Sequence, residues 1–174
     1  TGLPDLPGTV RLTRHAVDLG CRACMVLPPF YFKDPSDEGL FRHFAELIER
    51  VDDHRLRVVL YHIPQVAGVG IPTAVAARLR TEFPEQVVGL KDSSGDWATT
   101  EAFLDIDGLT VWPGAELPLL DALDRGSPGC ITATANVNPG PVVEVVRQYG
   151  KGGREAAADA MGRARAYRLA LQGQ

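Results

Sequence analysis

Two polar residues stand at the ends of short apolar runs, where a buried strand would carry them to its edge. Lys91 follows the apolar run 87–90, and Tyr61 follows the run 58–60. Burial disfavours the charged form of a lysine, so a lysine held in such a place shifts toward the neutral amine that Schiff-base chemistry needs. A phenol beside it could move protons as an acid/base. Taken alone, each side chain is more simply a snorkelling lysine or a core tyrosine, and it is their pairing that predicts covalent chemistry on a carbonyl.

The elements that would position this pair follow a repeating pattern. Short apolar runs alternate with amphipathic helical stretches, as expected of βα units with parallel strands. The pattern predicts strands at about 22–28, 57–62, 86–91, 109–113 and 128–133. It predicts a first helix at about 7–19, a second with the apolar face 40–51, and a third between Pro72 and Pro84. A fourth helix is expected after a cap at Asp96, and a fifth would contain Leu117, Leu120 and Leu123. Two more are expected from Pro139 to Tyr149 and, beyond a glycine break, at about 154–171.

Every expected strand is followed by a helix, which favours a (β/α) barrel, with an open doubly wound sheet as the alternative. In a barrel the carboxyl ends of the strands form one rim, so Tyr61 and Lys91 would face each other there. The chain has 174 residues, whereas eight strands and their helices take about 250. We therefore expect residues 1–174 to form a single α/β domain that is an incomplete part of a longer chain.

Composition narrows the class of protein. The chain is 45% apolar and 23% charged, which is ordinary for a globular domain. A net charge of -4 and a pI near 5.5 provide no basic patch for nucleic acid. No run approaches the ~20 apolar residues of a membrane span, and the three cysteines are too few for a disulfide framework. We expect a cytoplasmic protein without nucleic-acid or membrane partners.

The residues that could bind metal are scattered. Cys21 and Cys24 have a C-x-x-C spacing but run into a strand, where residues three apart face opposite sides, and no second pair completes four ligands. The four histidines do not cluster in the sequence, and His62 stands alone beside Tyr61. Dinucleotide and Walker glycine loops are also missing from the sequence. We predict no metal and no cofactor.

The motifs around the pair are specific. Tyr61-His62-Ile63-Pro64, followed by Gly89-Leu90-Lys91-Asp92-Ser93-Ser94-Gly95-Asp96, resembles the N-acetylneuraminate lyase and dihydrodipicolinate synthase superfamily of pyruvate-dependent class I aldolases. The segments 27–31, 113–116 and 129–136 resemble its fourth, seventh and eighth barrel strands. The resemblance covers essentially the whole chain. It implies the (β/α)8 TIM-barrel fold, with about five of the eight strands present.

The resemblance also implies roles. Lys91 would form the Schiff base with pyruvate or a related 2-keto acid, and Tyr61 would be the acid/base. Tyr31 matches the tyrosine that reaches across a dimer interface toward the neighbouring site, which implies a homo-oligomer, dimer or tetramer. Ser93 and Ser94 would make substrate-side contacts.

Gly114 and Ile131 would line the floor of the pocket. The carboxylates of Asp92, Asp96 and Glu116 stand at turns or helix starts, and we interpret them as structural. The turn before Asp96 could hold an anion or be a plain helix cap.

The chain departs from the family pattern in two places. Val66 stands where the dihydrodipicolinate synthases have an arginine for a substrate carboxylate, which disfavours that activity and favours the lyase and aldolase branches. The first three strands and their Gly-Thr-Thr-Gly-type loop have no counterpart, and residues 1–2 resemble the end of the third strand. A non-catalytic keto-acid-binding or regulatory protein, or a bare structural fragment, are the alternatives.

Overall fold

Four short parallel strands form the central sheet. They are β1 (Cys24–Val26), β2 (Val58–His62), β3 (Val87–Asp92) and β4 (Thr110–Pro113), and their order in the sheet is their order in the chain. Each neighbouring pair is parallel. The structure is a computed structural model that describes residues 1–172. Strands added one after another in the same direction build the wall of a barrel.

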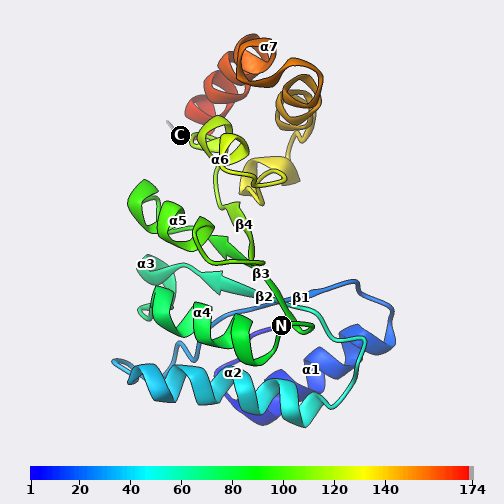
Figure 1. Ribbon diagram of the computed structural model, residues 1–174, viewed down its shortest axis with the longest axis vertical. Helices are drawn as coiled ribbons and strands as arrows, with labels where there is room; N and C mark the ends of the chain where they lie inside the picture. The colour runs from blue at the N-terminus through cyan, green and yellow to red at the C-terminus, as the bar shows by residue number, and fades with distance from the viewer. Residues whose placement is uncertain (173–174) are drawn as a thin grey trace.

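Helices connect and follow the strands. They are α1 (Leu6–Asp18), α2 (Asp37–Val51), α3 (Pro64–Ala67), α4 (Thr73–Glu82), α5 (Trp97–Leu104), α6 (Leu119–Asp124) and α7 (Gly140–Gln172), with a 3-10 helix η1 (Ala133–Asn136). Figure 1 shows α1, α2 and α4 together on one side of the sheet, and α6 and α7 at the far end of the molecule. The expected glycine break is confirmed inside α7, where Gly152 and Gly153 leave the helical conformation.

The prediction of a fifth strand at 128–133 is wrong. This segment runs beside β4, but Ile131 donates one backbone hydrogen bond to Pro113 O (3.0 Å) where a strand would make a ladder. Gly129 has φ = 155°, outside the β region open to other residues. The hydroxyl of Ser127 donates a hydrogen bond to Val111 O (2.7 Å). A side chain thus occupies a carbonyl of β4 that a neighbouring strand would otherwise bind through its backbone.

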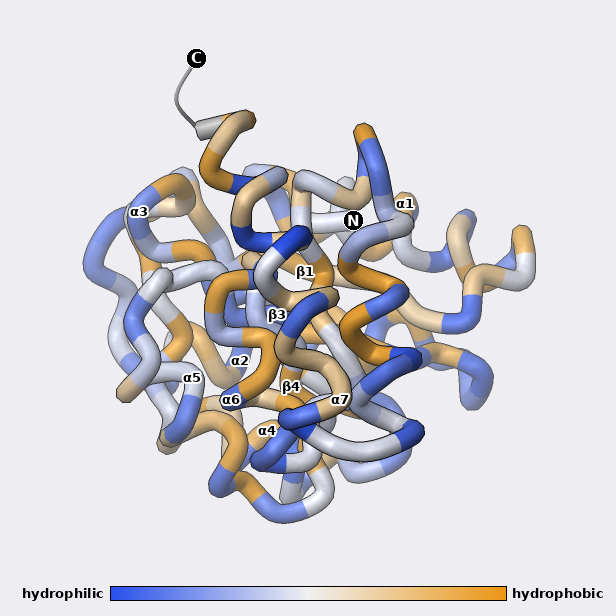
Figure 2. Tube along the Cα trace, turned by 90° about the horizontal axis from the view of Figure 1, so that it is seen from above, coloured by the Kyte–Doolittle hydropathy of each residue, from blue (hydrophilic) through white to orange (hydrophobic). Residues whose placement is uncertain are grey.

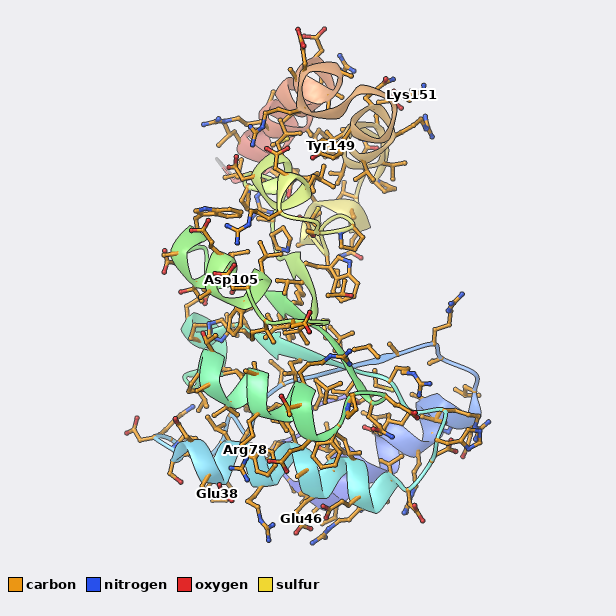
Figure 3. All side chains as sticks on the ribbon, in the orientation of Figure 1. Glu38, Glu46, Arg78, Asp105, Tyr149 and Lys151 are labelled. Carbon is orange, nitrogen blue, oxygen red and sulfur yellow. The ribbon has the colours of Figure 1, made fainter. Side chains whose placement is uncertain are left out.

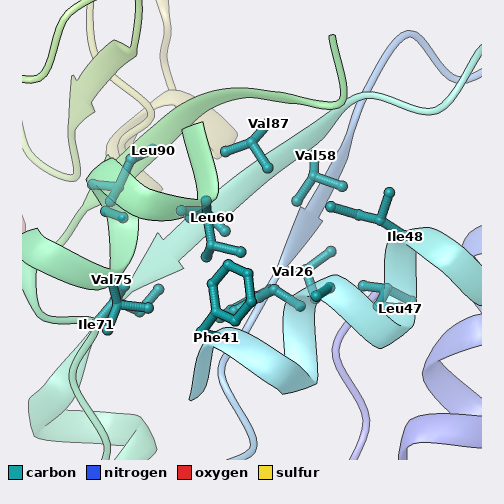
Figure 4. Packing of buried hydrophobic residues seen from close by; sticks show 14 of the residues in the cluster. Val26, Phe41, Leu47, Ile48, Val58, Leu60, Ile71, Val75, Val87 and Leu90 are labelled. Atoms are coloured by element: carbon teal, nitrogen blue, oxygen red, sulfur yellow. The ribbon is translucent and has the colours of Figure 1, made fainter. Parts of the chain in front are cut away.

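The helix-covered face of the sheet is the core. Ser36 caps α2 by accepting a hydrogen bond from Gly39 N (3.1 Å), and the helix then buries the whole predicted stripe. Figure 4 shows its side chains Phe41, Leu47 and Ile48 against Val26, Val58 and Leu60 of β1 and β2. Polar side chains line the outside of the same helices, as in the ion pair of Arg78 on α4 with Glu38 on α2 (2.6 Å; Figure 3).

The opposite face of the sheet is only partly covered. Successive residues of a strand face opposite sides, and in β1 and β4 the burial alternates between buried and half-buried. Met25, Tyr61 and Trp112 are half-buried on this inner face. The terminal amine of Thr1 donates to Met25 O (2.5 Å), so residues 1–2 lie beside β1.

A second apolar cluster lies between α6 and α7. Its buried members are Leu119, Leu123, Val142, Val145, Ala157, Ala160, Met161 and Ala164. Hydrophilic and hydrophobic segments alternate along the helices (Figure 2), as expected when one side packs and the other meets water. Among residues 1–172, no helix combines the length and the apolar character that crossing a membrane requires.

Candidate active site

Lys91 and Tyr61 meet at the carboxyl ends of β3 and β2. The two residues are partners in the parallel register, so their side chains project from the same face of the sheet. Lys91 Nζ donates to Tyr61 Oη at 3.0 Å and lies 4.2 Å from the centroid of the phenol ring. Lys91 is only 9% exposed. The predicted proximity of the amine and the phenol is confirmed.

A cavity of about 610 Å³ opens over this pair. Its volume is within the range of small-molecule sites and far exceeds what pyruvate alone would fill. The lining joins residues from the ends of β2, β3 and β4 with residues from α5, α6 and α7, and it includes Tyr61, Ile63, Gln65, Lys91, Ser93, Trp97, Gly114, Leu117, Asp121 and Arg168. The site therefore lies where a parallel barrel places its chemistry.

Asp92 fixes the turn that follows the lysine. Its carboxylate is buried and accepts hydrogen bonds from Thr100 Oγ1 (2.5 Å), Ser94 N (2.9 Å) and Ser94 Oγ (3.1 Å). Asp96 caps α5 as predicted, accepting from Ala98 N (3.2 Å). Both carboxylates are thus committed to the turn and the helix start, which supports the structural role expected of them.

Ser93 and Gly114 touch across the floor of the cavity. Gly114 N donates to Asp92 O (2.5 Å), and this bond draws the strand β4 against the turn after β3. A Cβ added at Gly114 would lie 2.0 Å from Ser93 Oγ and 2.8 Å from Ser93 Cβ. The position therefore requires glycine for the close approach of the two chains. Both residues line the cavity, and their contacts with substrate stay predictions.

The other three predicted site residues lie outside the cavity lining. Ser94 is held by Asp92, as described above. Ile131 is half-buried and bonded to Pro113 O. Tyr31 is 70% exposed and makes an edge contact with Phe32, with the ring centroids 5.4 Å apart. Their proposed roles stay predictions.

Sequence reasoning missed other residues of the cavity. Gln65, next to the tyrosine motif, donates through Nε2 to Ser93 O (2.5 Å) and so links the segments that follow β2 and β3. Trp97 at the start of α5 lines the cavity, whereas Phe103 of the same helix is buried. Arg168 reaches the cavity from α7, and no local signal marks it because that helix is rich in arginines.

A buried acid lies beneath α7. Glu116 is fully buried, accepts from Thr132 Oγ1 (2.6 Å) and lies 3.8 Å from Arg168 Nη1. Burial and the nearby Glu116 carboxylate raise the pKa of the Cys130 thiol to about 12. Cys130 is therefore a protonated, inert thiol at neutral pH. The contacts of Glu116 with Thr132 and Arg168 support the structural role expected of it, although its complete burial was not predicted.

Among residues 1–172, no three or more His, Cys, Asp or Glu side chains are grouped as metal ligands would be. The predicted lack of a metal or cofactor stays a prediction. Cys21 is exposed and Cys24 is buried, and both are free cysteines.

Comparisons with known proteins agree with this geometry. The model of the Dihydrodipicolinate synthetase family matches residues 1–169. An uncharacterized DapA-like lyase of Chloroflexus aurantiacus is 38% identical over 92% of this chain and 54% of its own length. The dihydrodipicolinate synthase of Thermotoga maritima superposes with a TM-score of 0.88 at 28% identity, and the match covers 99% of this chain and 59% of that one.

A third match is YagE, a prophage protein from E. coli K12 of the dihydrodipicolinic acid synthase family, solved in complex with pyruvate. It gives a TM-score of 0.85 at 26% identity over 93% of this chain and 54% of its own. This chain thus spans about half the length of the curated relatives it matches. The four observed strands form part of a TIM barrel of this type. The chain belongs to the dihydrodipicolinate synthetase family of lyases and aldolases.

Proposed function

We propose that the protein is a class I aldolase or lyase that makes or breaks a carbon–carbon bond beside the keto group of pyruvate or a related 2-keto acid. One observation supports this most strongly: an amine and a phenol 3.0 Å apart at the base of a cavity of about 610 Å³. The pyruvate found in YagE supports the class of substrate.

In this proposal Lys91 Nζ attacks the keto carbon and forms a carbinolamine. Tyr61 donates its proton to the departing hydroxyl, which leaves as water and yields the iminium. The iminium then accepts the electron pair of the breaking carbon–carbon bond and becomes an enamine, while a phenolate at Tyr61 takes the proton of the substrate hydroxyl. In the reverse direction the enamine attacks an aldehyde.

We do not expect the aldehyde partner to have a carboxylate that this protein binds as dihydrodipicolinate synthase binds its own. Val66, where that enzyme class has an arginine, lies in α3 and is 76% exposed. A valine makes no charge-assisted contact. We therefore favour an aldolase or lyase other than the lysine-pathway synthase, even though several relatives bear that synthase name.

Assembly and location complete the proposal. The exposed Tyr31 and Phe32 present apolar surface suited to a homo-oligomer interface, dimer or tetramer, through which Tyr31 would approach a neighbouring site. The three free cysteines favour a reducing compartment, and we propose the cytoplasm.

Borohydride trapping tests the nucleophile. The full protein is incubated with pyruvate and reduced, and peptide mass spectrometry should locate one adduct at Lys91. Within residues 1–174 the other lysines are Lys33 and Lys151, so peptides from this part of the protein distinguish an adduct at Lys91 from one at either of them. Lys151→Arg is the matched control, since Lys151 lies on the far helical part of the molecule (Figure 3). It should keep the adduct, and Lys91→Arg should lose it.

The same experiment separates the alternative. A non-catalytic keto-acid-binding protein would show a rise in melting temperature with pyruvate but no reduced adduct and no product. A folded protein that yields no adduct at Lys91 would overturn the Schiff-base proposal.

A further inference from the structure

His62 directly follows Tyr61, and its side chain lies on the helix-covered face of the sheet. It is 7% exposed, and its ring centroid lies 5.2 Å from that of Phe103 on α5. Its Nδ1 accepts a hydrogen bond from Ile71 N at 2.9 Å. Only an unprotonated Nδ1 can accept, so the ring is neutral with its proton on Nε2.

The segment 63–71 wraps around this ring. Gly68, at φ = 66°, turns the chain after α3, and Val69 and Ile71 are buried beyond it. A Cβ added at Gly70 would lie 3.2 Å from His62 Cε1, so the backbone passes close against the imidazole. The end of the segment is therefore held by the histidine.

The other end of the same segment forms a wall of the Lys91 cavity. Ile63 and Gln65 line the cavity, and Gln65 Nε2 donates to the carbonyl of Ser93, which follows the neighbouring strand β3. A change in how the segment is anchored at Ile71 is thus transmitted along only a few residues to the wall of the site.

We propose that His62 is a positioning residue, and that its protonation releases the segment 63–71 and loosens the wall of the Lys91 cavity. Protonation turns Nδ1 into a donor that faces the N–H of Ile71, and two donors cannot share a hydrogen bond. The consequence for Schiff-base formation rests on the function proposed above. The release of the segment does not.

The charged groups around the ring come from three directions. Asp92 of β3 is its partner in the parallel register. Asp34 and Asp37 line a cavity of about 360 Å³ on the side of α2, which His62 also lines. Lys33, which precedes α2 in the chain, donates to the carbonyl of Ala67 in the segment 63–71 (3.2 Å). Helix α5 places the apolar ring of Phe103 against the imidazole.

Burial lowers the pKa of His62 below its usual value, and the opposing effect of Asp92 is smaller. A histidine with a lowered pKa in the ordered state stabilises that state fully above the ordinary histidine value. This stabilisation is lost as the pH falls through the lowered value. The segment should therefore be ordered at neutral pH and released in acid.

Hydrogen exchange measured by mass spectrometry tests this on the full protein. Exchange of peptides covering 63–71, corrected for intrinsic rates, is followed between about pH 5 and 8. In the wild type it should rise as the pH falls, by at most about tenfold per pH unit, the limit for one linked proton. His62→Asn keeps an acceptor for Ile71 N but cannot be protonated, so its exchange should stay low throughout. His54→Asn, at an exposed site, should behave as the wild type.

His62→Leu removes the acceptor and should exchange fast at every pH. Should that variant fail to fold, His62→Asn still decides the matter. Wild-type exchange that is independent of pH, or the same pH dependence in His62→Asn as in the wild type, would overturn the proposal. Because exchange requires no catalysis, a failed borohydride experiment would remove the proposed function and leave this inference standing.

Discussion

At the scale of single residues, the site depends on which face of the sheet each side chain occupies. Tyr61 and Lys91 are register partners on the inner face, while their neighbours His62 and Asp92 are partners on the helix-covered face. A slip by one residue would exchange the two pairs and bury the amine among helices. The apolar runs before both residues made this pairing predictable from the sequence. The positions of Gln65 and Arg168 at the cavity were not predictable from the sequence, because they depend on how distant parts of the chain pack together.

Tyr61→Phe isolates the hydroxyl from the ring. The phenyl ring keeps its contact with the Lys91 amine, 4.2 Å from the centroid, but loses the oxygen 3.0 Å from Nζ. We expect adduct formation with pyruvate to slow by about 10²–10⁴, the usual contribution of an acid/base group, with little change in melting temperature. Rapid-quench reduction with mass detection measures the rate. An unchanged rate would exclude Tyr61 as the proton donor.

Gly114→Ala tests the close approach on the cavity floor. The new Cβ would lie 2.0 Å from Ser93 Oγ, and the backbone of Ser93 leaves little room to move away. We expect a loss of about 1–3 kcal/mol in the free energy of unfolding, typical of overpacking. The control is Gly162→Ala in α7, where nothing lies within 4 Å of the new Cβ. It should stabilise the chain by about 0.5–1 kcal/mol, since alanine favours a helix. Denaturant unfolding measures both.

At the scale of elements, the sequence predicted those helix ends that depend only on neighbouring residues. The cap at Asp96 and the glycine break in α7 are short-range features that the sequence predicted, and the structure confirms them. The segment 128–133 is apolar enough for a strand, but its pairing with β4 reduces to one backbone bond from Ile131. Strand formation depends on a partner far along the chain, which a local pattern does not reveal. The short α3 was missed because it is only four residues long.

Ser36→Ala tests the start of α2. The substitution leaves the N–H of Gly39 without its side-chain acceptor at 3.1 Å. Loss of such a cap should lower the free energy of unfolding by about 1 kcal/mol. Ser36→Asp retains an acceptor and adds a negative charge at the helix N-terminus, so it should be at least as stable as the wild type. Thermal unfolding of the pair gives the comparison, and equal stability of Ser36→Ala and the wild type would contradict the capping role.

At the scale of the whole molecule, one face of the sheet is covered by helices and the opposite, inner face is only partly covered. Helices α1, α2 and α4 bury the first, while Met25, Leu27 and Trp112 are half-buried on the second. The sequence predicted a barrel wall of this kind from strands that each precede a helix. The relatives are about twice as long as this chain. Lys91 and Tyr61 lie on this partly covered face, so any chain that covered it would also enclose the proposed site.

The 174-residue chain studied alone should therefore associate through its inner face. Half-exposed apolar side chains and an unsaturated sheet edge favour pairing with another chain. Size-exclusion chromatography with light scattering should give a mass above 18.8 kDa. Thr110→Glu puts a charge on the inner face, where Thr110 is half-buried beside Gly89, and should shift the mass toward the monomer. Ala158→Glu, on the exposed side of α7, is the matched control and should leave the mass unchanged. A monomeric wild-type chain would show that the inner face is stable in water without a partner.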